Sequence, residues 1–248
     1  MNRLSEAGDG MTLTKIAERV GLAPSTVHRL LTTLEQERYV RFDPERRLWS
    51  VGVQAYLAGR AFLETRDLVG AARPFMRTLM EECRATVNLA VEDRREAIFV
   101  HRVEHPPVAR PPANPVLRLP LHCSAVGKAM LAARTDSELE SLLPEDEARR
   151  FTAKTIVRRS ALRDDIALTR ERGFAVDDEE HEIGLRCVAA LVFNEFGETM
   201  AAISISGPAT RISSSSIPRF GALLRQKAAG ITAKLGGAGP EAVGRFRA

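Results

Sequence analysis

The sequence is poor in cysteine and has no long run of apolar residues. Its 248 residues contain three cysteines, Cys83, Cys123 and Cys187, which are widely spaced and odd in number. Such usage argues against a disulfide framework and indicates reduced thiols. We find no secretory leader and no apolar run long enough to span a bilayer. We therefore expect a cytoplasmic protein without a membrane partner. We also find no internal repeat.

Length and charge allow two domains but say little about the partner. A chain of this length exceeds most single domains. Its net charge is +4 and its isoelectric point is about 9.2. Residues 1–60 carry nine Lys or Arg against seven Asp or Glu. Evidence for a nucleic-acid partner must therefore come from the pattern of residues rather than from bulk charge.

Residues 14–34 have the spacing of a helix-turn-helix. Gly21 is suited to end the first helix in the left-handed conformation, Leu22 to plug the inside of the turn, and Pro24 to occupy the first turn of the next helix. An ordinary surface hairpin would not need this combination. The small, apolar and glycine positions that carry the prediction are Ile16, Ala17, Val20, Gly21, Leu22, Val27, Leu30 and Leu34.

The second helix of this motif has an apolar face and a face suited to the major groove. The apolar face is expected to comprise Val27, Leu30, Leu31 and Leu34. Short hydrogen-bonding side chains that can contact base edges remain on the outside. They are Ser25, Thr26, His28, Arg29, Thr32 and Thr33.

A wing follows the two helices. Residues 38–42 and 47–51 read as two strands around a polar turn. Arg46 and Arg47 at the tip could contact phosphate or enter the minor groove, although either could equally be a solvated turn residue. The side chains expected to pack under the helices are Val40, Phe42 and Leu48.

The rest of the chain mixes helices with strands and predicts an α+β sheet domain. We expect a connecting helix over 53–63, an amphipathic helix from Asp67 to Met80, and helices capped by Ser124 and Ser160. A further helix should span 218–235. The expected strands cover residues 86–91, 97–103, 174–176, 188–193 and 200–206. The proline-rich stretch 105–115 reads as an extended loop, and the glycine-rich end from Gly236 as a flexible tail.

Three segments of this second domain could bind a ligand. Residues 119–128 lead into a helix N-terminus, where free amides can hold an anionic oxygen and Gly127 would allow close approach. Residues 177–182 form an acidic cluster, most of which suits a solvated turn; Asp177 and Cys187 are exceptions because each adjoins a strand end. Ser204 and Ser206 share a face and would line a cavity if Ile203 and Ile205 face the core. By themselves these segments also fit a plain capped helix and an exposed strand face.

Taken together, these residues resemble the isocitrate-lyase-regulator (IclR) family of bacterial transcription factors. The resemblance covers nearly the whole chain. It rests on the winged module to Gly52, on residues 119–132, on GFAVDDEE at 173–180, on GLRCVAA at 184–190 and on AAISISGP at 201–208.

The resemblance implies an architecture, partners and a pocket. The expected parts are a winged helix-turn-helix over residues 1–52, a linker helix over 53–66, a GAF-like effector domain over 67–235 and a flexible tail over 236–248. It implies double-stranded operator DNA and a small organic-acid effector as partners, homodimers that can pair into tetramers, control of a catabolic operon, and neither cofactor nor catalysis. By motif position the pocket comprises Ser124, Ala125, Val126, Gly127, Asp177, Cys187, Ser204 and Ser206.

The charge of Asp177 limits the chemical class of the effector. An ionised Asp177 would repel a carboxylate, so either the ligand offers it a hydroxyl or hydrated aldehyde, or Asp177 is protonated on binding. A small hydroxy or keto acid fits best.

The N-terminal residues depart from the family pattern, which has a longer first helix before the helix-turn-helix. We hypothesise that the chain starts at an internal methionine or has been trimmed. Leu13, Ile16, Val20 and Leu30 would then be partly exposed, and the DNA-binding domain would be weakened.

Other classes of function remain open. Cys187 could serve an enzyme as nucleophile with His181 or His122 as base, although no local signature supports this. His122, Cys123, His181 and Cys187 are residue types that suit zinc, but their spacing matches no usual motif. The chain could also be a metabolite-binding module without effective DNA binding.

Overall fold

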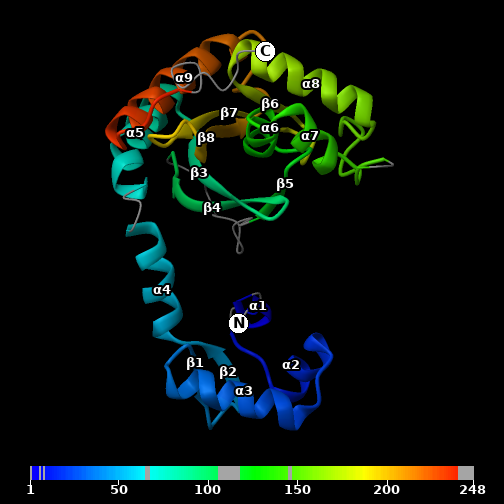
Figure 1. Ribbon diagram of the computed structural model, residues 1–248, viewed down its shortest axis with the longest axis vertical. Coiled ribbons are helices and arrows are strands. Elements are labelled where there is room, and N and C mark those ends of the chain that lie inside the picture. Colours follow the sequence, from blue (N-terminus) through cyan, green and yellow to red (C-terminus); the bar gives the residue numbers. More distant parts are fainter. Residues whose placement is uncertain are drawn as a thin grey trace. The chain divides into compact units, whose positions relative to one another are not determined.

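The computed structural model describes residues 2–5, 7, 9–64, 68–105, 118–144 and 147–239. The chain divides into two compact units, Met1–Asp67 and Leu68–Ala248 (Figure 1). Of the two segments expected to lack regular structure, residues 106–115 of the proline-rich stretch and 240–248 of the tail lie outside the described residues. No helix within the described ranges is long and apolar enough to cross a membrane.

The first unit is a winged helix-turn-helix. Along the chain it contains α1 (Asn2–Ser5), α2 (Leu13–Val20), α3 (Pro24–Gln36), β1 (Val40–Asp43), β2 (Leu48–Val51) and α4 (Val53–Glu64). β1 and β2 pair antiparallel. A bridge between Met11 and Trp49 ties the segment before α2 to the wing.

One core holds this unit together, and it corrects several expectations. Val40 and Trp49 are buried in it and Phe42 packs against it, whereas Leu48 lies outside because strand alternation turns it to the other face. Ile16, expected to be partly exposed, is 5% exposed because Leu4 of α1 and Met11 share its core. Leu13 is half-buried, while Val20 and Leu30 are exposed.

The second unit is an α+β domain, as expected from the sequence. It contains α5 (Leu68–Cys83), β3 (Thr86–Asp93), β4 (Glu96–Val103), β5 (Arg118–Pro120), α6 (Ala125–Ala132), α7 (Asp136–Leu142), α8 (Arg159–Arg172), β6 (Ala175–Asp178), β7 (Leu185–Phe193), β8 (Thr199–Pro208) and α9 (Ile217–Lys234). Six strands pair antiparallel in the order β5-β4-β3-β8-β7-β6. The short α7 was not expected from the sequence, and β5 lies at the start of the segment that leads into α6.

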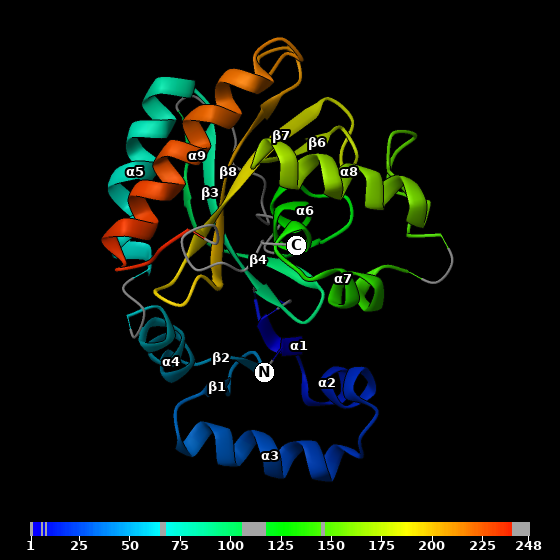
Figure 2. The ribbon, with the colours of Figure 1, turned by 45° about the horizontal axis from the view of Figure 1, so that its top comes forward.

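Helices cover both faces of this sheet (Figure 2). On one face α5 and α9 lie side by side, and their apolar residues join Ile203 and Ile205 of β8 in one core. On the other face α6 and α8 pack over a second core that includes Ala189 of β7 and Ala202 of β8. Because neighbouring strand residues point to opposite faces, Ser204 and Ser206 lie on the α6 side.

The helix ends in this unit follow local chemistry, with one exception. The hydroxyl oxygen of Ser124 accepts a hydrogen bond from the Gly127 amide and caps α6, as expected. Gly173, at φ 74°, ends α8. Ser160 is not a cap, because α8 already begins at Arg159, whose guanidinium is held by the main chain of α7 and the residues after it.

Candidate DNA-binding and effector sites

The turn between α2 and α3 has the geometry that the glycine position predicts. Gly21 takes φ 66°, and the Leu22 amide donates to the carbonyl of Ala17, which closes the end of α2. The side chain of Leu22, however, is 45% exposed and does not plug the turn. On α3 the buried stripe is carried by Val27 and Leu31, while Leu30 is 53% exposed.

The outer face of α3 is as polar as expected. Ser25, Thr26, His28, Arg29 and Thr33 are exposed and Thr32 is half-buried. The hydroxyls of Thr32 and Thr33 donate to the carbonyls of His28 and Arg29, one turn earlier. The His28 ring meets the Trp49 ring edge-on, with centroids 6.3 Å apart, and so links this face to the wing.

Arg46 and Arg47 lie in the turn of the wing, where both are exposed. The carboxylate of Asp43 accepts hydrogen bonds from the backbone amides of Glu45 and Arg46, and these bonds fix the turn. Arg47 has φ 53°. Both arginines are therefore exposed on a folded turn.

The residues expected to form the effector site gather on one side of the second unit's sheet. In the strand register Asp177 of β6 pairs with Cys187 of β7, and Cys187 pairs with Ser206 of β8. Ser204 lies two residues from Ser206 on the same face. Residues Ala125 and Val126 of α6 share the core on this face, which brings the helix N-terminus and the strands together.

The N-terminus of α6 is built by its neighbours as well as by its cap. The Ser124 hydroxyl, in addition to its cap bond, donates to the carbonyl of Pro120 at 2.7 Å. Gly127 has no room for a side chain, since a Cβ there would lie 2.3 Å from Cα of Leu121. The main chain of Leu121 fills the space that a side chain would need, so packing by itself requires glycine at position 127. The first amides of the helix, ahead of the helical ladder, are the groups suited to an anion.

Asp177 is buried and holds its own loop. Its Oδ1 accepts the Glu180 amide at 2.8 Å, and the residue is 3% exposed. Burial raises the pKa of Asp177 to about 7, and the nearby Glu180 carboxylate adds to that rise, against the lowering effect of the amide and of Lys128. When Asp177 is protonated it is uncharged and can donate a hydrogen bond. The carboxylate of a ligand can then lie next to it without repulsion.

Sequence reasoning missed a buried ion pair beside this site. Lys128 of α6 is 1% exposed, and its ammonium lies 2.5 Å from Oε1 of Glu180 and 2.9 Å from Oδ2 of Asp165. Although burial lowers the pKa of Lys128, these two carboxylates raise it above its ordinary value and keep the ammonium charged. The available signal was a lysine inside the otherwise apolar segment 125–132.

The acidic loop is therefore only partly a solvated turn. Glu182 is exposed as expected, but Glu180 is 4% exposed. The carbonyl of Glu180 also accepts the Thr155 hydroxyl at 2.7 Å. Glu179 pairs with Lys154. Glu180 thus joins the Asp177 loop to α6 and to residues 152–155.

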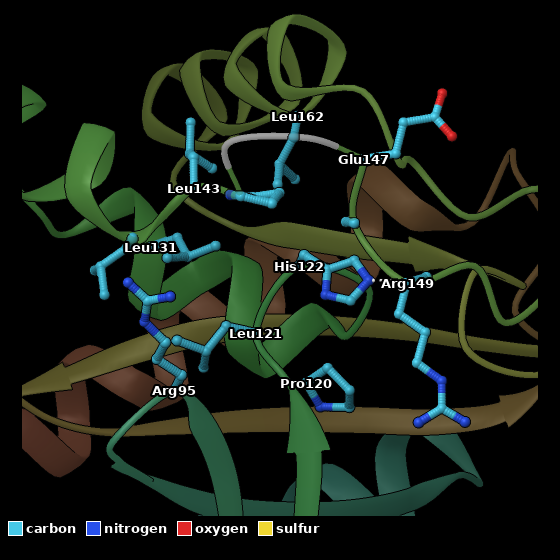
Figure 3. Close-up of a pocket in the computed structure, with 12 residues that line it drawn as sticks. Arg95, Pro120, Leu121, His122, Leu131, Leu143, Glu147, Arg149 and Leu162 are labelled. Atoms are coloured by element: carbon cyan, nitrogen blue, oxygen red, sulfur yellow. Dashed lines mark hydrogen bonds between the residues drawn. The ribbon is translucent and has the colours of Figure 1, made fainter.

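A separate hollow of about 260 Å³ lies beside this site (Figure 3). Apolar side chains from α6, α7 and α8, among them Leu131, Leu142 and Leu162, line it together with Leu143 and His122. A ring nitrogen of His122 is 2.9 Å from the carbonyl oxygen of Arg149, the contact that is dashed in the figure. None of the eight expected effector residues lines this hollow.

The chemistry of the thiols does not support a cysteine nucleophile. Burial raises the pKa of Cys187 well above its ordinary value, and the pKa of Cys123 to about 12. Neither thiol is activated, because a nucleophile needs a lowered pKa. Among the described residues no three His, Cys, Asp or Glu side chains are grouped to hold a metal ion.

The fold defines a class of protein: a transcriptional regulator with a winged helix-turn-helix and a separate α+β domain. The chain belongs to the IclR family. Residues 60–233 match the family described as the bacterial transcriptional regulator IclR C-terminal domain, and residues 1–44 match the IclR helix-turn-helix domain.

Named relatives agree with this assignment. The chain is 41% identical over 236 residues to the transcriptional repressor IclR of Escherichia coli, covering 94% of this chain and 86% of the relative. It is 40% identical to the acetate operon repressor of Salmonella typhimurium, with the same coverage. An IclR homologue from Microbacterium hydrocarbonoxydans, crystallised with 4-hydroxybenzoate, is 25% identical, with a TM-score of 0.79 over 91% of both chains.

Proposed function

We propose that this regulator binds operator DNA through α3 and the wing and responds to a small organic acid held in its second unit. The observation that carries the effector half is the register of Asp177, Cys187 and Ser206 beneath the N-terminus of α6. The site comprises the residues expected from the sequence: Ser124, Ala125, Val126, Gly127, Asp177, Cys187, Ser204 and Ser206.

Each part of the site has a distinct role in this proposal. The first amides of α6 and the positive end of its dipole hold the carboxylate of the effector. Ser124 shapes that turn because its hydroxyl is held by the main chain, and Gly127 shapes it by allowing Leu121 to pack closely. Asp177, with its pKa near neutrality, donates a hydrogen bond when protonated or accepts one from a hydroxyl when ionised. The 4-hydroxybenzoate bound by a homologue is an acid of this kind.

DNA recognition follows from the first unit. Ser25, Thr26, His28, Arg29 and Thr32 on α3 would face the major groove, and Arg46 and Arg47 of the wing would contact phosphate. We place the boundaries at residues 1–52 for the DNA-binding domain, 53–66 for the linker helix and 67–235 for the effector domain. A homodimer, or a tetramer of paired dimers, in the cytoplasm would present two winged modules to two half-sites.

Control would operate by population shift. An effector can change DNA affinity only if it binds one arrangement of the paired modules more tightly than another. The arrangement it favours sets the half-site spacing that the dimer can satisfy.

The test is binding of the purified chain to a fluorescent DNA fragment from upstream of its own gene, with glyoxylate, pyruvate and a panel of hydroxy and aromatic acids. We expect tight, salt-sensitive binding that one acid alters. DNA binding that no acid changes would contradict the effector proposal. Absence of DNA binding, with an acid still raising thermal stability, would leave a sensor module and contradict the DNA-binding half.

A further inference from the structure

A buried amide on β3 lies unsatisfied beside the proposed effector site. Asn88 interrupts the apolar strand β3 and is 3% exposed. Its Nδ2 donates to the Ser206 hydroxyl at 3.2 Å, but its Oδ1 is buried and has no hydrogen-bond partner in the part of the chain that the structure describes. A buried acceptor without a donor is costly and rare, so it calls for an explanation.

The register places Asn88 against the effector residues. It pairs directly with Ser204 across β3 and β8, so the two side chains share a face. Its own hydrogen bond reaches Ser206, which pairs in turn with Cys187. A continuous polar strip therefore runs from Asp177 on β6 to Asn88 on β3, on the side of the sheet that α6 covers.

We infer that Asn88 contacts the effector and determines its class, because its free Oδ1 accepts a hydrogen bond from a ligand hydroxyl. This inference rests on the proposed function and sharpens it. The preferred ligand is then a hydroxylated carboxylate, which includes an aldehyde acid in its hydrated form. A plain carboxylate is ionised at neutral pH and offers only acceptors, so it cannot satisfy Oδ1.

The donors and acceptors of the site also orient the ligand. Its carboxylate turns toward the amides at the start of α6, which donate hydrogen bonds, and away from the Asn88 oxygen, which only accepts them. Its hydroxyl lies over the strip formed by Asn88 and Ser204. A site built to bond a hydroxyl rejects the analogue that lacks it, because a buried polar group is then left unpaired.

The experiment compares ligands that differ by one hydroxyl. Binding of glycolate and acetate, and of 4-hydroxybenzoate and benzoate, is measured by calorimetry on the full chain and on its Asn88→Leu and Asn88→Ala variants. For whichever pair binds, we expect the unaltered chain to prefer the hydroxylated acid about three- to tenfold. Both variants should bring that ratio close to one. Leu fills the space and Ala leaves it empty, so a loss shared by both reflects the missing acceptor.

A matched control removes a partly buried hydrogen bond on the other side of the sheet. The hydroxyl of Thr232 on α9 accepts the Phe193 amide at 3.1 Å, and Thr232→Val should keep the hydroxyl preference. Carboxylate binding without preference in the unaltered chain, or a preference that survives in both Asn88 variants, overturns the inference and leaves the proposed function intact. If neither pair binds while another plain acid does, the inference also fails; if no acid binds, the effector proposal fails with it.

Discussion

The ammonium of Lys128 lies 2.5 Å from Oε1 of Glu180, although the two residues are 52 positions apart in sequence. Lys128 comes from α6 and Glu180 from the loop after β6, so the contact joins the two segments on which the proposed effector site depends. Asp165 of α8 forms an ion pair with the same ammonium. One cation thus holds together a helix N-terminus, a binding loop and a covering helix.

Removing that cation should be costly. We expect Lys128→Met to reduce the free energy of unfolding by about 3–5 kcal/mol, because it leaves the buried Glu180 carboxylate unpaired. The double variant Lys128→Met with Glu180→Gln should regain part of that loss. Denaturant unfolding measures both. Lys227→Met, which breaks a pair with Glu82 near the surface, serves as the control and should cost at most about 1 kcal/mol. A loss no larger than the control's would contradict this expectation.

Asp177 should make stability depend on pH. Its pKa is about 7 in the folded protein and about 3.8 ordinarily, so between these values the folded chain retains a proton that the unfolded chain has released. The contribution of Asp177 to stability is therefore lost as pH rises from about 4 to about 7. Asn cannot titrate, so Asp177→Asn should gain stability relative to the unaltered chain over this window, by a few kcal/mol.

Thermal and denaturant unfolding of both chains at several pH values test this expectation. Four other titratable groups lie near Asp177: Glu180, Lys128 and the thiols of Cys123 and Cys187. The pKa values of Lys128 and of both thiols are raised, so these three groups keep their protons throughout this pH range. The difference between the two chains isolates Asp177, because the other groups are common to both. A difference that stays constant between pH 4 and 8 would show that Asp177 is ionised throughout.

The same proton should govern binding of carboxylates. Above about pH 7 Asp177 becomes ionised and opposes an anionic ligand, so affinity for a responding acid should fall as pH rises, approaching tenfold per unit. The Asp177→Asn variant should show a nearly flat profile from pH 6 to 8.5. Calorimetric titration across this range checks both curves, and parallel profiles for the two chains would exclude Asp177 as the cause.

Gly127 should tolerate no side chain. An alanine Cβ would approach the main chain of Leu121 to 2.3 Å, so Gly127→Ala should destabilise the second unit by about 1–3 kcal/mol or more through backbone shifts. Gly59 of α4 is the matched control, because a Cβ there meets no atom within 4 Å. Gly59→Ala should be neutral or stabilising by up to about 1 kcal/mol. Equal effects in thermal unfolding would refute the packing role of Gly127.

Replacing arginines of the wing and of α3 should affect DNA binding in different ways. Replacing Arg46 and Arg47 together by Ala should weaken binding to all sequences alike and lower the slope of affinity against salt by about one for each phosphate that is no longer neutralised. Arg29→Ala on α3 should instead change the preference among operator sequences. Arg77→Ala on α5 is the control. Titration of DNA variants at several salt concentrations separates these effects, and an unchanged slope would place the wing off the DNA.

Much of this molecule could be predicted from local pattern. The glycine at position 21 determines where α2 ends, and the hydroxyl of Ser124 determines where α6 begins, because both act through neighbouring backbone groups. Ser204 and Ser206 share a face with each other because a strand has a period of two. These relationships depend on residues a few positions apart, so the sequence is sufficient to establish them.

Only the tertiary structure decided which side chains meet across the sheet and which are buried. Glu180 has the sequence context of a solvated loop residue, yet Lys128 lies against it, and Asn88 belongs to no motif, yet its register sets it beside Ser204. Leu30 fits a helical apolar stripe but is exposed, whereas Val27 and Leu31 of the same helix are buried in the core of the first unit. Burial and pairing arise between segments far apart in the chain, so no local periodicity can encode them.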